Sequence, residues 1–168
     1  NKRVKINDIS FEGNKAISDG KLRGSMKDTK EKHWYRIFST SKFQEESYEK
    51  DKIKIISKYN AKGYRDAKIV FDTVQKHNEK TLDIRIKIEE GHKFFFRHIS
   101  WVGNTKHTSQ ELDAILGIKR GDIFDQAMLE SRLYMRQSGR DVSSLYMDDG
   151  YLFFDLKPVE VKVENDSI

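Results

Sequence analysis

The 168-residue chain contains no cysteine. This absence excludes disulfide bonds, thiolate catalysis, and zinc or iron–sulfur sites with cysteine ligands. Long hydrophobic runs are also missing: no stretch approaches the roughly 18 consecutive apolar residues of a transmembrane helix. The first residues, NKRVKINDI, lack the apolar segment of a signal peptide. We therefore expect a soluble globular chain with no targeting segment within these residues.

Motifs that carry catalysis or bind cofactors are equally scarce. The sequence holds no phosphate-binding loop, dinucleotide fingerprint, or pair of histidines at a metal-binding spacing. A Ser-x-x-Lys pattern starts at Ser18, but it recurs at Ser39 and Ser47, which is the behaviour of a chance match. We predict that the protein is not an enzyme and needs no metal or cofactor. The five histidines, interpreted as surface residues, are His33, His77, His92, His98 and His107.

The charges are numerous but mixed along the chain. There are 32 basic and 27 acidic residues, for a net charge of +5, and they alternate too finely to form a long basic tract. This pattern favours solvated faces. A pair of RNA- or DNA-binding α+β domains remains an alternative function, because the chain is basic and 11% aromatic. That alternative needs a basic stripe on a sheet face, whereas the run LDIRIKI alternates acidic and basic residues between its apolar ones.

The sequence contains an internal repeat. ISFEGN, at residues 9–14, returns ninety positions later as ISWVGN, at residues 99–104. In the first copy, apolar periodicity and turn residues predict a β-α-α-β-β order. Ser18 or Asp19 is the expected N-cap of its first helix. The expected elements are a strand at 4–11, a helix near 18–26, a helix ending before Gly63, and strands at 67–74 and from Thr81.

The second copy follows the same order with changed spacing. We expect a strand in FFFRHISWVGN, residues 94–104, and a helix capped by Thr108 or Ser109. The next helical region, residues 124–151, is long, and Ser138 with Gly139 is expected to kink or split it. At the offset of the two GY sequences, Thr81 corresponds to Ile168, so the second copy lacks its last strand. We expect the parent protein to continue beyond this point.

The order and spacing of these elements, twice over, resemble POTRA domains of the BamA family of outer-membrane assembly factors. An aromatic loop in the first copy, KHWYRIFSTSKFQ, is similar to that of the third POTRA domain, so the second copy looks like the fourth. The resemblance implies an α+β fold of two tandem domains, at 1–91 and 92–168. Each has a small mixed sheet covered by two helices on one face. POTRA regions of two-partner secretion transporters or organelle import barrels remain alternatives.

In the family the last strand lies between the first two, which makes the second strand an exposed edge. The resemblance implies a periplasmic scaffold at the outer membrane of a Gram-negative bacterium. Its partners would be unfolded β-barrel clients, accessory lipoproteins and the parent's own C-terminal barrel, without nucleic acid. Clients would add a strand at the edge, whose residues are Lys68, Ile69, Val70, Phe71, Asp72, Thr73 and Val74. A possible partner-binding aromatic loop contains Trp34, Tyr35 and Phe38.

The edge has a simpler interpretation, which the sequence leaves open. Charged residues on an edge strand protect it from aggregation, and Lys68 with Asp72 would serve that purpose. Strict alternation also predicts that Ile69, Phe71 and Thr73 share one face of this strand, with Asp72 on the other.

Overall fold

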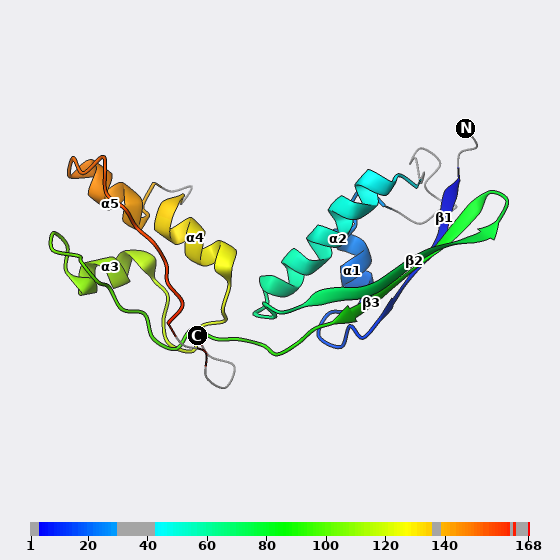
Figure 1. Cartoon of the computed structure of the whole chain (residues 1–168), viewed down its shortest axis with the longest axis horizontal. Helices are drawn as coiled ribbons and strands as arrows, with labels where there is room; N and C mark the ends of the chain where they lie inside the picture. Colours follow the sequence, from blue (N-terminus) through cyan, green and yellow to red (C-terminus); the bar gives the residue numbers. More distant parts are fainter. Residues whose placement is uncertain (1–3, 30–42, 136–138, 162, 164–167) are drawn as a thin grey trace. The chain divides into compact units, whose positions relative to one another are not determined.

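The computed structural model describes residues 4–29, 43–135, 139–161, 163 and 168 (Figure 1). The chain divides into two compact units. The first comprises residues 1–60 and 66–91, and the second comprises residues 61–65 and 92–168. Each unit has a hydrophobic core of its own.

The first unit is a three-stranded sheet with two helices on one face (Figure 1). The strand order is β1-β3-β2, with β3 parallel to β1 and antiparallel to β2. This arrangement confirms the predicted α+β class and the predicted place of the last strand. The elements are β1 (Lys5–Glu12), α1 (Asp19–Ser25), α2 (Glu45–Asn60), β2 (Lys68–Asn78) and β3 (Thr81–Glu89).

The central strand β3 supplies the core of this unit. Ile84, Ile86 and Ile88 alternate along it and are all buried beneath the helices. Burying such a side chain stabilises the fold by about 1.5–3 kcal/mol, so this row alone outweighs any surface ion pair. Apolar side chains of the helices and β1 pack on the same side; the fully buried ones include Ile6, Ile9, Leu22, Met26, Ile55 and Tyr59.

Two β-bulges interrupt the regular alternation. In β1 the register shifts at Asn7, so Ile6 and Ile9, three residues apart, both reach the core. In β2 the register shifts at Val70: Ile69 lies opposite Ile88, whereas the next paired residue, Phe71, lies opposite Lys87. The prediction that Ile69 and Phe71 share a face is therefore wrong. The extra residue turns every later side chain of β2 to the opposite face.

In each unit the repeated GN corner holds the chain that enters the first helix in place. The Asn14 side-chain amide donates to the Ile17 carbonyl oxygen at 3.0 Å and to the Asp19 carboxylate at 2.7 Å. Ser18 is the N-cap residue, but its side chain makes no capping hydrogen bond, contrary to expectation. Asn104 repeats the first contact, donating to the His107 carbonyl oxygen at 3.0 Å. The recurring asparagine is therefore a structural element.

The helices of the second unit are α3 (Ser109–Leu116), α4 (Gln126–Tyr134) and α5 (Val142–Asp148). Thr108 caps α3 in a capping box with Glu111, as predicted. The long helical region divides in two, and its second part starts after the N-cap Asp141. Two phenylalanines of the incoming chain join these helices in one core, whose buried members are Phe94, Phe96, Leu112, Leu116, Ile118, Phe124, Leu133 and Val142.

The strand expected at residues 94–104 is reduced to a short paired stretch. The Phe96 N–H donates to the Asp122 carbonyl oxygen at 2.8 Å on one side, and the Ile168 N–H donates to the Phe95 carbonyl oxygen at 2.9 Å on the other. Beyond these pairs the described residues of this unit form no strand ladder. In the first unit, by contrast, β1 and β2 both pair with β3.

The two corner glycines give a matched test of this architecture. Gly13 and Gly103 have φ values of +84° and +81°. A Cβ atom at Gly13 would overlap the Ile88 backbone oxygen, whereas none of the described atoms lies within 4 Å of a Cβ at Gly103. Gly103→Ala should cost about 1–2 kcal/mol for the positive φ. Gly13→Ala should cost clearly more, because β1 and β3 must separate.

Urea denaturation, monitored through amide exchange in each unit, measures the loss of stability that each substitution causes. Equal losses of stability would show that the overlap at Ile88 does not govern the corner of the first unit.

Candidate binding edge of the first unit

The β2 strand has one open edge. It pairs with β3 along Lys68–Asn78, and no other strand of the described residues pairs with its far side. Such an edge presents backbone N–H and C=O groups that an extended segment can pair with. The strand is longer than predicted, since the turn occupies only Glu79 and Lys80. Sequence reasoning missed Gln75–Asn78, although the Val74–Lys76 stretch continues without a turn residue.

On the side of the sheet that faces the helices, an ion pair connects the edge strand β2 to α2. Lys52 of α2 donates to the Asp72 carboxylate at 3.2 Å and contacts the Glu49 carboxylate at 2.8 Å. The Lys52 ammonium also lies 5.0 Å from the centre of the Tyr48 ring. Burial, and secondarily the Asp72 carboxylate, raise the pKa of the Tyr48 hydroxyl, which therefore stays protonated. Asp72 is thus occupied within the fold and does not point out along the edge.

The other face of the sheet is uncovered by the described elements and mostly charged. Arg85 and Lys87 lie on this face of β3, and Arg85 approaches the Glu12 carboxylate of β1 at 3.6 Å. Phe71, which pairs with Lys87, is 53% exposed and is the one large aromatic on the described part of this face. Val70, at the bulge, is also exposed, as is Val74, which pairs with Ile84 and therefore lies on the helix side of the same strand. We call Val70, Phe71 and Val74 the edge patch.

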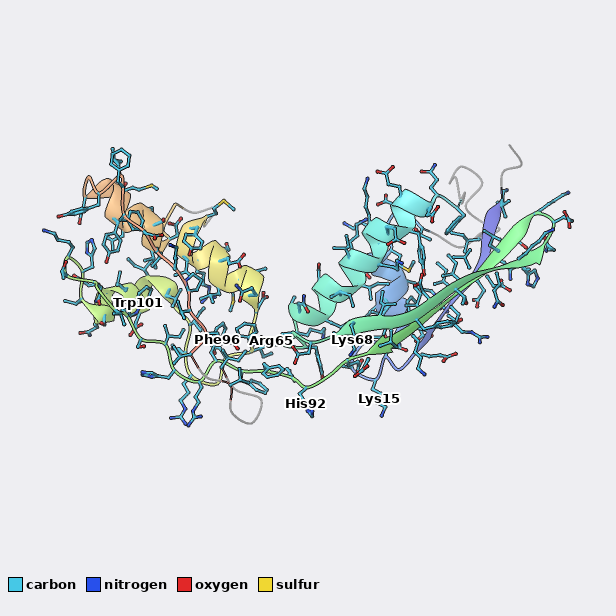
Figure 2. The ribbon with its side chains drawn as sticks, viewed as in Figure 1. Lys15, Arg65, Lys68, His92, Phe96 and Trp101 are labelled. Atoms are coloured by element: carbon cyan, nitrogen blue, oxygen red, sulfur yellow. The ribbon has the colours of Figure 1, made fainter. Side chains whose placement is uncertain are left out.

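The predicted site residues fall into two groups. Lys68 through Val74 lie together on β2; the label of Lys68 in Figure 2 marks the start of this strand. Lys68 contacts Glu89 of β3 at 3.3 Å, so this charge is partly engaged in the sheet. The aromatic loop residues Trp34, Tyr35 and Phe38 lie outside the described residues.

Within the described ranges no three acidic or histidine side chains gather as a metal site. Nor does any helix there have the length and apolarity that crossing a bilayer requires.

The first unit is thus a small α+β domain whose three-stranded sheet has an open edge at β2. The family model named POTRA, described as a surface antigen variable number repeat, matches residues 4–91 and 94–168. The chain belongs to the POTRA family.

Two relatives and one solved structure extend the comparison. The chain is 31% identical over 134 residues to the outer membrane protein assembly factor BamA of Neisseria meningitidis, covering 79% of this chain. It is 28% identical over 155 residues to a putative outer membrane protein assembly factor of Treponema pallidum, covering 89%. It spans 17% of the length of each relative.

The crystal structure of Haemophilus influenzae BamA POTRA3-5 matches with a TM-score of 0.56 and 26% identity. The match covers 79% of this chain and 56% of that one. It supports the predicted likeness to the middle POTRA domains.

The tie between α2 and β2 is testable. Asp72→Ala should destabilise the first unit by about 1–2 kcal/mol, because Lys52 loses a partly buried charged partner, and should speed amide exchange in β2. Lys50→Ala, which removes the exposed pair with Glu46 on the same helix, is the control and should change neither. A stability of Asp72→Ala equal to the unsubstituted chain would show that the ion pair does not hold the edge.

Proposed function

We propose that this chain belongs to the periplasmic part of an outer-membrane protein assembly factor, where it acts as a non-catalytic scaffold. In this role it receives unfolded β-barrel clients by strand addition at the β2 edge. It also connects accessory lipoproteins with the parent's own barrel. The observation that supports client binding is the open edge itself, with its exposed edge patch.

The shape of the edge suits an extended, apolar–polar alternating segment. Between the bulge at Val70 and the register shift near His77, residues Phe71–Lys76 pair with β3 without interruption. An added strand would therefore find about six regular positions. Backbone hydrogen bonds supply affinity that hardly depends on sequence, which fits a receptor for many barrel proteins. Barrel strands share alternating apolar and polar residues and aromatic girdles.

The sheet face argues against the nucleic-acid alternative. Phosphate binding needs a surface of one sign, but the outer face combines Arg85 and Lys87 with Glu12, Asp83 and Glu89. The ion pair of Arg85 with Glu12 further reduces the positive potential.

A photo-crosslinking experiment with a matched control tests the proposal. A photoreactive phenylalanine analogue replaces either Phe71 or Glu12, which lie in one row across the outer face, on opposite edges of the same sheet. With an unfolded β-barrel protein as client, we expect crosslinks at position 71 several-fold above those at position 12.

Competition identifies the mode of binding. A peptide copied from one barrel strand should reduce the crosslink, whereas the same peptide with proline at every second position should not. Equal crosslinking at both positions, or equal competition by both peptides, would contradict strand addition at β2.

A further inference from the structure

The side of the sheet that faces the helices, the helix side, offers one apolar position along the open edge of β2. Cross-strand partners direct their side chains to the same face of a sheet. Val74 pairs with Ile84, which is buried beneath the helices, so Val74 lies on the helix side, where it is 37% exposed. Its neighbours on this side, two residues before and after it, are the charged residues Asp72 and Lys76. Along the uninterrupted stretch of β2, Val74 is therefore the apolar contact on the helix side.

The outer face of the sheet also offers one apolar position. Phe71 pairs with Lys87 and lies on this face, where it is 53% exposed. The next two side chains on the same face, Thr73 and Gln75, are polar and uncharged. Val70 is exposed as well, but it forms the bulge and has no partner in the ladder with β3. Each face of the uninterrupted stretch thus carries a single apolar position.

These two apolar positions are three residues apart and on opposite faces. In an added strand, successive side chains alternate between the two faces of the sheet. A segment with apolar side chains at every second position therefore packs against Phe71 or against Val74, but not against both. A segment with apolar side chains three positions apart packs against both, because its two side chains lie on opposite faces. This spacing is the same whichever way the segment runs.

We propose that the β2 edge selects extended segments that carry two apolar side chains three positions apart, with polar residues between them. The proposal rests on strand addition at β2, which is the proposed function. An aromatic side chain suits the position opposite Phe71, because aromatic cross-strand pairs are stabilising. An aliphatic side chain suits the position opposite Val74, where it removes apolar surface from water. A barrel strand that alternates strictly still binds, through its backbone and one of the two positions.

Two labelled peptides of identical composition test the spacing by fluorescence anisotropy with the full 168-residue chain. Both contain one phenylalanine and one valine among threonine and glutamine residues. The two apolar residues are three positions apart in one peptide and two positions apart in the other. We expect the three-apart peptide to bind about threefold or more tightly, because it forms one additional apolar cross-strand pair. Equal affinities would overturn the proposal.

Exchanging two neighbouring residues of β2 should reverse this preference. Thr73→Val combined with Val74→Thr keeps both positions β-branched. The exchange moves the apolar position from the helix side to the outer face, two residues after Phe71. The two-apart peptide should then bind about threefold or more tightly than the three-apart peptide. Val74→Thr alone should abolish the preference. A preference that stays as it is in the unsubstituted chain, in either variant, would contradict the proposal.

The matched control is Val102→Thr. It makes the same change at a valine of the second unit that is 96% exposed, so it should leave both peptide affinities unchanged. Equal loss of the preference in Val102→Thr and in Val74→Thr would overturn the proposal, since the effect would then not depend on the edge.

Crosslinking at position 71 separates this proposal from strand addition itself. Both peptides should compete with the barrel client for the crosslink, and the three-apart peptide should do so at the lower concentration. Competition by both peptides at the same concentration would overturn the spacing preference and leave strand addition at β2 intact. Failure of both peptides to compete would contradict the spacing preference and strand addition together.

Discussion

Pairing on both sides of β3 is the constraint on which the first unit depends. The backbones of β1 and β2 both pair with this one strand, and its isoleucines form the apolar sheet surface on which the helices pack. Because β3 is central, both of its neighbours are necessarily edges. The GN corner at Gly13 lies against Ile88 of the same strand, so even the turn into α1 is shaped by it. The candidate edge therefore follows directly from the strand order.

Among the described residues of the second unit, helix packing takes the place of a strand ladder. Ile168 meets Phe95 and Arg97, and the stretch around Phe96 is held from the other side by the turn after α3. Helix packing around Phe94, Phe96 and Phe124 then provides most of the core. In the same unit, the guanidinium of Arg132 donates to the carbonyl oxygens of Leu116, the last residue of α3, and of the C-cap Gly117. Helix-to-helix contacts thus organise this core.

The sequence predicted those features that depend on local periodicity. Alternation from Leu82 to Ile88 identified β3, and Gly139 indicated the division of the long helical region. The bulges at Asn7 and Val70 escaped prediction, because an extra residue leaves no mark on a half-polar strand. The bond between Lys52 and Asp72 was also missed, since it joins residues whose proximity arises from packing.

The parallel pairing of β1 with β3 also fixes the order in which the first unit can assemble. β2 and β3 are joined by a two-residue turn, so their ladder closes locally. β1 must instead find a partner 76 positions away, as Asn7 does with Asp83, and such long loops close slowly. We therefore expect β1, although it comes first in the chain, to pair after the hairpin has formed. Without β1 the hairpin would have two open edges, at β2 and at β3, and each could pair with a neighbouring chain.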